Sequence, residues 1–432
     1  MKNDPIRHRL ERNRRGETVG VYSVCSVHRQ VLQAAILQAK EDGSLLLLES
    51  TSNQVDQFGG YSGMTPDRFV SSVRTIADEM GFAPSRIILG GDHLGPNAWQ
   101  KESAAAAMAK ARDQVIAYRK AGYYKFHLDA TFCCADDPAP RLPMELIAER
   151  TALLAQAVES PSSSDAPEPL YVIGSDVPKP GGTAAAVTTI DVTPAKEVKE
   201  IIHLTQKAFA RRGLQDAWQR VIAIVAQPGV EFEHAAVHDY QRDPARELTQ
   251  FIEIEERLVY EAHSTDYQTE MALHDLVRDH FAILKVGPWL TSAFREAVFA
   301  LAMIEKEWLE QRKDVQLSRL METIEQEMMK NPIHWQSHYR GAPPEQALAR
   351  RYSLSDRMRY YWPLDAVQKS LHRLFANLGA HPAPAGLLSQ YAPDQYEAIR
   401  QNEITPDPLQ IVHHKIRQVI KKYVRAAGMD RP

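Results

Sequence analysis

Eight short apolar segments, separated by helical patterns, constrain what this chain can fold into more than any other feature. They cover residues 21–25, 45–48, 87–89, 123–128, 170–173, 221–225, 258–262 and 282–286. Most are rich in Val, Ile, Leu and Tyr and too short for helices, as expected of strands buried on both faces. The segments between them carry apolar residues at helical spacing, and glycines such as Gly81 and Gly122 end two of the patterns.

This alternation predicts a (β/α)8 TIM barrel over residues 1–330. An open, doubly wound α/β sheet is the alternative, but it usually has fewer strands and a glycine-rich nucleotide loop after the first strand. Here the sequence SVCSVH at 23–28 carries no GxGxxG motif. Residues 331–432 do not continue the alternation and contain proline-rich breaks. We expect them to form a helical C-terminal extension packed on the barrel or on a partner.

The composition argues against several classes of partner. The formal net charge is −4, whereas nucleic-acid-binding proteins are usually basic. No apolar run approaches the ~18 residues that a membrane span needs. The charged N-terminal segment has no apolar core of the kind that a secretory signal carries, and three cysteines do not make a disulfide framework. We therefore expect a cytoplasmic protein that binds neither nucleic acid nor membrane.

Polar side chains follow seven of the eight predicted strands, and barrel active sites are built at the C-terminal ends of strands. A single His or Asp at such a position is more often structural or a helix cap. Polar side chains at seven strand ends together indicate a functional site. The candidates are Glu49, Asn53 and Gln54, Asp92 and His93, His127 and Asp129, Asp176, Gln227 and Glu231, His263 and Ser264, and Lys285.

Imidazole and carboxylate groups together form the ligand set of Zn²⁺, Mn²⁺ or a similar ion, which would polarise a sugar carbonyl. The predicted metal ligands are His93, His263, Glu231 and Asp176. The predicted proton-transfer residues are Asp92, Glu49 and Asp129. The predicted substrate-binding residues are Asn53, Gln54, His127, Gln227, Ser264 and Lys285.

Several longer motifs resemble one family. The chain is similar, over nearly its whole length, to the Z subunit of class II D-tagatose-1,6-bisphosphate aldolase, through ESTSNQVDQFGGYSGMTP (49–66), GGDHLGPNAW (90–99), EAHSTDYQT (261–269) and NPIHWQSHYRG (331–341). The resemblance implies a barrel like that of class II aldolases and a place in galactitol or N-acetylgalactosamine catabolism. It also implies a non-catalytic subunit that supports a separate catalytic Y subunit, a ketose phosphate as ligand, and a homo- or hetero-oligomer.

Comparison with the catalytic class II aldolases implies roles for individual residues. GGDHLG resembles their Asp-His element, so Asp92 would be the acid/base and His93 a zinc ligand, and EAHSTD places another ligand at His263. Where the family has an intermediate histidine, this sequence has Gln227. Glu231 or another carboxylate would then have to complete the coordination of the metal.

The sequence leaves two other functions open. Some relatives are associated with ketose or ketose-phosphate 4-epimerisation, in which Asp92 would remove the C4-hydroxyl proton and the C3–C4 bond would break and re-form. Others carry the label tagatose 6-phosphate kinase, but the sequence has neither a GxxxxGK[ST] loop nor a kinase motif set. We take the aldolase Z subunit as the main interpretation.

The C-terminal extension carries an arginine-rich and aromatic segment, RRYSLSDRMRYYWP, at residues 350–363. The first interpretation is a solvated helix that covers the barrel. There are two more specific alternatives. One is a phosphate-binding site made by Arg351, Ser353 and Arg357, and the other is a subunit contact rich in Tyr, Trp and Arg.

Overall fold

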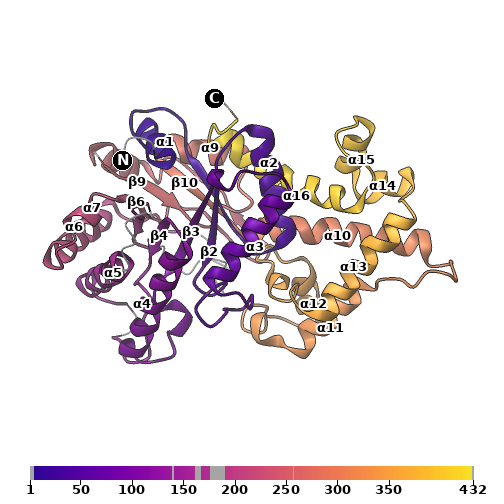
Figure 1. The fold of residues 1–432 in the computed structure, drawn as a ribbon, viewed down its shortest axis with the longest axis horizontal. Coiled ribbons are helices and arrows are strands. Elements are labelled where there is room, and N and C mark those ends of the chain that lie inside the picture. Colours follow the sequence, from indigo (N-terminus) through magenta and orange to yellow (C-terminus); the bar gives the residue numbers. More distant parts are fainter. Residues whose placement is uncertain (1–3, 139–140, 161–166, 176–189, 256, 431–432) are drawn as a thin grey trace.

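The computed structural model describes residues 4–138, 141–160, 167–175, 190–255 and 257–430. Eight parallel strands close into a barrel in the order β1-β10-β9-β6-β5-β4-β3-β2 (Figure 1). Every predicted strand is present, and the predicted TIM barrel is confirmed. The strands are β1 (Val21–Cys25), β2 (Leu46–Thr51), β3 (Ile87–Leu94), β4 (Lys125–Leu128), β5 (Leu170–Ile173), β6 (Val221–Val225), β9 (Val259–Ala262) and β10 (Phe281–Val286).

Helices between the strands form the outer ring. Local sequence sets their ends: Ser103 Oγ accepts a hydrogen bond from the N–H of Ala106 at the start of α4, and Gly122 ends that helix with a φ of 95°. The helices of the ring are α2 (Arg29–Asp42), α3 (Pro66–Glu79), α4 (Ala104–Ala121), α5 (Met144–Glu159), α6 (Ala195–Arg211), α7 (Gln215–Trp218), α8 (Arg246–Ile254) and α9 (Glu270–Arg278).

Short secondary-structure elements lie in the loops of the barrel. An antiparallel hairpin of β7 (Glu231–Phe232) and β8 (Val237–His238) follows β6, and the single 3-10 turns η1 (Pro84–Arg86) and η2 (Pro96–Trp99) flank β3. Within the described residues, no helix combines the length and the apolar character that crossing a membrane requires.

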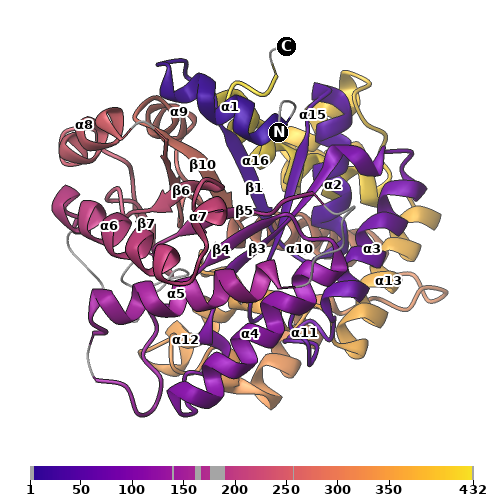
Figure 2. The ribbon, with the colours of Figure 1, turned by 60° about the vertical axis from the view of Figure 1, so that its left-hand side comes forward.

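An N-terminal helix, α1 (Pro5–Arg14), closes one mouth of the barrel. Asp4 caps it by accepting hydrogen bonds from the N–H groups of Ile6 and Arg7. Ile6 and Leu10 are buried in one apolar cluster with inward-facing strand residues such as Val21 and Leu47. Because β1 begins directly after this region, α1 lies at the N-terminal ends of the strands (Figure 2).

The C-terminal part is helical, as expected, and lies beside the barrel (Figure 1). The long helix α10 extends away from β10, and the last helix, α16, returns to pack against α10, α2 and α9. The division at residue 330 stays a prediction. The elements are α10 (Pro288–Leu309), α11 (Leu320–Lys330), η3 (Pro332–His334), α12 (Pro343–Tyr352), η4 (Arg357–Tyr360), α13 (Asp365–Ala380), α14 (Ala385–Tyr391), α15 (Pro393–Arg400) and α16 (Pro408–Ala426).

Candidate functional site

Three histidines and an aspartate meet at the C-terminal ends of the barrel strands. Asp92 and His93 lie in β3, His127 lies in β4, and His263 directly follows β9. One potential ligand atom from each lies within 4.8 Å of the others, and all four residues are buried. The centroids of the three imidazole rings are 4.7, 5.0 and 5.1 Å apart. The cluster therefore gathers residues that are up to 171 positions apart in the chain, Asp92 and His263 being the extremes.

Two glycines make room for this arrangement. A Cβ atom on Gly90 would lie 2.6 Å from the Oε1 atom of Glu49, on the neighbouring strand. A Cβ atom on Gly91 would lie 2.6 Å from the Cδ1 atom of Leu94 and 2.8 Å from the ring of Tyr118. Strand β3 thus carries glycines because the side chains of Glu49, Leu94 and Tyr118 occupy the space that a side chain at these two positions would need.

Hydrogen bonds behind the rings fix which nitrogen faces the cluster. His93 Nδ1 lies 2.7 Å from Asp129 Oδ2, which leaves Nε2 for the cluster. His127 Nε2 donates to the carbonyl oxygen of Gly174 at 2.8 Å, so its Nδ1 faces the cluster, where it lies 2.9 Å from Asp92 Oδ1. Asp129 is itself held, since Ser175 Oγ donates to its Oδ2 at 2.9 Å. This carboxylate–imidazole pairing is common behind metal-binding histidines.

The charges in the cluster stabilise one another. Burial would raise the pKa of Asp92, but the three histidines, led by His93, hold it well below its usual range. Burial lowers the pKa of His93, and the carboxylates of Asp92 and Asp129 more than reverse this effect and raise it. Against the effect of burial, His93 also lowers the pKa of Asp129 to about 2. Both carboxylates are therefore ionised at neutral pH.

A buried ion-pair network lies directly beneath the cluster. Lys125 Nζ lies 2.6 Å from Glu49 Oε1 and 2.6 Å from Glu261 Oε2. Lys285 Nζ contacts Glu49 and lies 2.9 Å from Asp92 Oδ1, which joins the network to the cluster. Lys125 and Glu261 were not predicted as site residues because they lie within apolar strand segments. Glu49 is thus held between two lysines inside the barrel.

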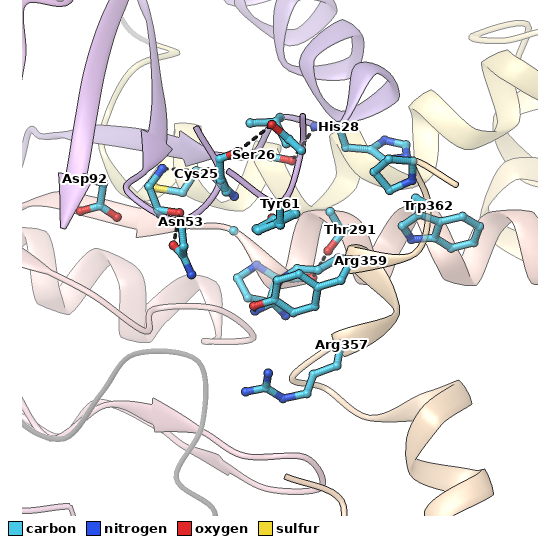
Figure 3. Close-up of a pocket in the computed structure, with 18 of the residues that line it drawn as sticks. Cys25, Ser26, His28, Asn53, Tyr61, Asp92, Thr291, Arg357, Arg359 and Trp362 are labelled. Carbon is cyan, nitrogen blue, oxygen red and sulfur yellow. Dashed lines mark hydrogen bonds between the residues drawn. The ribbon is translucent and has the colours of Figure 1, made fainter. Parts of the chain in front are cut away.

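A cavity of about 740 Å³ opens above the cluster, a volume typical of small-molecule sites. Asp92, His93, His263 and Lys285 line it from the barrel, together with the predicted residues Asn53, Gln54 and Ser264. The opposite wall belongs to the C-terminal extension and includes Arg357, Arg359, Tyr360 and Trp362 (Figure 3). Ser264 adopts a φ of 52°, and among the described residues its buried hydroxyl has no hydrogen-bond partner.

A model of the family "D-tagatose-1,6-bisphosphate aldolase subunit GatZ/KbaZ-like" matches residues 6–428. The chain belongs to this GatZ/KbaZ-like family. It is 49% identical over 415 residues to the D-tagatose-1,6-bisphosphate aldolase subunit GatZ of Escherichia coli O1:K1 / APEC, which covers 96% of this chain and 98% of that protein. The GatZ of Shigella boydii serotype 18 matches with the same identity and coverage.

A solved structure agrees with this assignment. The crystal structure of a "probable tagatose 6 phosphate kinase" from Sinorhizobium meliloti 1021 superposes with a TM-score of 0.86 and 39% sequence identity, and covers 94% of this chain and 100% of that one. The resemblance drawn from the sequence motifs is therefore confirmed for the whole GatZ/KbaZ-like chain.

The third imidazole of this GatZ/KbaZ-like chain comes from an unexpected strand. His93 and His263 lie in the cluster as predicted ligands, and His127, which we predicted to bind substrate, joins them. Gln227 lies outside the cluster, and its Oε1 instead accepts hydrogen bonds from the N–H groups of Gly229 and Val230. The sequence feature that could have indicated His127 as a member of the cluster is its place two residues before Asp129, on a strand next to β3.

The other predicted ligands are placed differently. Glu231 lies in the hairpin strand β7, where its Oε1 accepts from the N–H of Phe232 at 2.9 Å, and it is not part of the four-residue cluster. Asp176 lies outside the described residues. The predicted roles of all site residues, including proton transfer by Asp92, Glu49 and Asp129, stay predictions. The donor set that the structure brings together, three imidazoles and one carboxylate, fits Zn²⁺ or a similar divalent ion.

Proposed function

We propose that this GatZ/KbaZ-like chain is the non-catalytic subunit of a class II tagatose-1,6-bisphosphate aldolase. It supports the activity and stability of a catalytic Y-type subunit, in the cytoplasm, during galactitol or N-acetylgalactosamine catabolism. The observation that carries the proposal is 49% identity to proteins named as this subunit, over 98% of their length. The partner is a separate chain, so the working assembly is a hetero-oligomer.

We also propose that the cavity binds a divalent metal ion, Zn²⁺ or Mn²⁺, and a ketose phosphate. His93, His127, His263 and Asp92 would hold the ion, because their donor atoms converge and are buried. Such an ion acts as a Lewis acid on a ketose carbonyl. Asp129 keeps His93 in the tautomer that presents Nε2, and the network of Lys285 and Glu49 fixes the carboxylate of Asp92.

The low pKa of Asp92 bears on its role. A carboxylate that stays ionised far below neutral pH accepts hydrogen bonds and binds cations well, but is a weak base at pH 7. Asp92 therefore suits ligation and hydrogen bonding to a substrate hydroxyl. Ser264, whose buried hydroxyl lines the same cavity, is placed to hydrogen bond a sugar.

The test is an assay with a purified class II Y-type subunit. We expect this chain to raise the rate of tagatose 1,6-bisphosphate cleavage by the Y-type subunit and to lengthen its half-life at assay temperature. No effect on either quantity would contradict the proposal. A His93→Ala variant tests whether the cluster contributes to this effect on the Y-type subunit. The control is His203→Ala, which changes an exposed histidine.

Assays of the purified chain alone distinguish the accessory role from the epimerase and kinase alternatives. Interconversion of fructose 6-phosphate and tagatose 6-phosphate by this chain alone, lost in His93→Ala, would identify a metal-dependent 4-epimerase instead. Consumption of ATP with tagatose 6-phosphate would identify a kinase. Either result would replace the accessory role with an activity of this chain.

A further inference from the structure

We infer that Arg357 and Arg359, from the C-terminal extension, form a phosphate-binding subsite in the cavity wall that faces the histidine cluster. This inference rests on the proposed function, because it assumes that a phosphorylated sugar enters the cavity. Figure 3 shows both arginines on the extension, across the pocket from Asp92. The barrel would then hold the reacting end of the sugar, and the extension would hold its phosphate.

Both arginines belong to one short turn that is fixed to the barrel. The 3-10 turn η4 begins after Asp356, which adopts a φ of 43°. Thr291 Oγ1 of α10 donates to Asp356 Oδ2 at 2.5 Å, and Arg295 Nη1 of the same helix lies 3.7 Å from Asp356 Oδ1. The positions of Arg357 and Arg359 are therefore set by α10, the helix that follows the last barrel strand.

Among the described residues, neither guanidinium forms a close ion pair. Arg357 is only 9% exposed, its Nη1 donates to the carbonyl oxygen of His334 at 3.0 Å, and its Nε is buried with no hydrogen-bond partner among the described residues. Arg359 donates to the carbonyl oxygens of Ser355 and Asp356 and to the hydroxyl of Tyr360. Across the described part of the chain, no carboxylate oxygen lies within 4.0 Å of either guanidinium.

Arg357 is buried and Arg359 is half-buried, and a guanidinium withdrawn from water without a carboxylate in direct contact carries an electrostatic cost that a bound anion offsets. Guanidinium groups match the oxygens of phosphate in geometry and charge, which makes Arg the usual choice for this ligand. The neighbouring Tyr360 reports the strength of the local field. Burial alone would raise the pKa of its phenol, but Arg359 and Arg357 lower it below the usual value.

Two other arginines of the same segment, Arg350 and Arg351, are already paired with a carboxylate. Arg350 Nη2 lies 2.5 Å from Glu325 Oε1, and Arg351 Nε lies 3.6 Å from Glu325 Oε2. Ser353 Oγ shares a 2.9 Å hydrogen bond with Ser355 Oγ. Of the three residues that the sequence analysis considered for a phosphate grip, only Arg357 lines the cavity, and Arg359 takes the place of the other two.

The test compares the binding of tagatose 6-phosphate, free tagatose and inorganic phosphate to the full chain with Mn²⁺ present, by calorimetry. We expect Arg357→Ala to weaken the binding of tagatose 6-phosphate by about tenfold or more and to leave free tagatose unchanged. Arg359→Ala should do the same, and Arg357→Lys should retain part of the affinity. Arg351→Ala, in the same extension, should change nothing.

The outcomes separate this inference from the proposed function. Binding of tagatose 6-phosphate that depends on His93 but not on Arg357 or Arg359 would overturn the subsite and leave the proposed ligand in place. Arginine-dependent binding of inorganic phosphate without binding of the sugar phosphate would support the subsite and overturn the proposed ligand. A wild-type chain that binds none of the three compounds would overturn both. Equal thermal unfolding of wild type and Arg357→Lys shows that the change is local.

Discussion

At the scale of single residues, the cluster depends on the groups that hydrogen bond to the ring nitrogens of its histidines on the side away from the cluster. Asp129 Oδ2 lies 2.7 Å from His93 Nδ1 and cannot itself reach the cluster through that atom. We expect Asp129→Asn to weaken metal binding by roughly 10–100-fold, because an amide no longer enforces the tautomer of His93. Titration with Zn²⁺ against a chromophoric chelator measures this. The control is Asp394→Asn, which changes an exposed carboxylate. If Asp129→Asn binds Zn²⁺ as tightly as the wild type does, Asp129 does not position His93.

A second residue-scale prediction concerns Asp266, which joins the cavity to α10. Its Oδ1 accepts hydrogen bonds from the N–H groups of Gly287 at 3.0 Å and Trp289 at 2.7 Å. Asp266→Ala leaves these buried donors without their acceptor, so we expect a loss of about 1–3 kcal/mol in the free energy of unfolding. Asp266→Asn keeps a carbonyl acceptor and should lose less. Urea denaturation measures both, and an unchanged midpoint for the alanine variant would refute this capping role.

Residue roles were harder to predict from sequence than residue positions. Asp92, His93 and His263 could be placed at one mouth because the ends of parallel strands share an edge. Lys125 and Glu261 could not, because a charge buried by ion pairing looks in sequence like an interruption of an apolar strand. His127 could not be distinguished from a substrate-binding residue, since only the register of β4 against β3 shows which imidazoles converge.

At the scale of elements, the N-terminal helix α1 is the least expected part of the fold. Its sequence is dominated by Arg, Asn and Glu, and only Ile6 and Leu10 carry its apolar contact with the barrel. The strands, by contrast, were predictable, because burial on both faces leaves continuous apolar runs. Two apolar residues in a charged segment are too weak a pattern to predict a helix that plugs a barrel.

We expect Leu10→Ala to lower the free energy of unfolding by about 2–5 kcal/mol, because the side chain is 3% exposed and the barrel residues around it cannot all move inwards. The exposed neighbour Glu11, changed to alanine, should have little effect. Chemical denaturation followed by tryptophan fluorescence checks both. A Leu10→Ala variant as stable as Glu11→Ala would show that α1 is not part of the core.

The contact between α16 and α2 should depend on pH. Burial lowers the pKa of His413 to about 4, and its Nε2 lies 3.0 Å from Gln30 Oε1. The unfolded chain binds a proton at this residue below about pH 6.5 and the folded chain does not, so stability falls as the pH drops towards 4. The loss is at most about 2 kcal/mol between pH 7 and pH 5.

The measurement is urea denaturation of wild type and His413→Gln across this range. Gln cannot titrate, so we expect the difference in unfolding free energy between the two proteins to shift in favour of the variant as the pH falls. A constant difference would show that His413 takes up its proton equally in both states.

At the scale of the whole molecule, the two ends of the chain meet and close the structure. Arg9 Nη2 donates to the carbonyl oxygens of Ala427 and Gly428, each at 2.8 Å, and Arg9 Nε donates to that of Gly20. Helix α16 packs against α2 and α9, on either side of it, and so occupies a place in the outer ring. The extension therefore serves the barrel as well as the cavity.

We predict that a chain ending at residue 330 does not fold into a stable barrel. It lacks α16, so the apolar surfaces of α2, α9 and α10 that this helix covers would face water. Near-ultraviolet circular dichroism and thermal unfolding of residues 1–330 provide the check, with the full chain as control. A fragment that unfolds cooperatively would instead establish the boundary that the sequence predicted.

The proposed metal site requires three imidazoles that converge in one cluster, with His127 rather than Gln227 as the third residue. The direct measurement is the metal content of the full chain after equilibration with Zn²⁺ or Mn²⁺ and removal of excess. We predict about one ion per chain in wild type and in Gln227→Ala, and a loss of the ion in His93→Ala, His127→Ala and His263→Ala. A wild-type chain without metal, or a His127→Ala variant that retains it while Gln227→Ala loses it, would contradict the account.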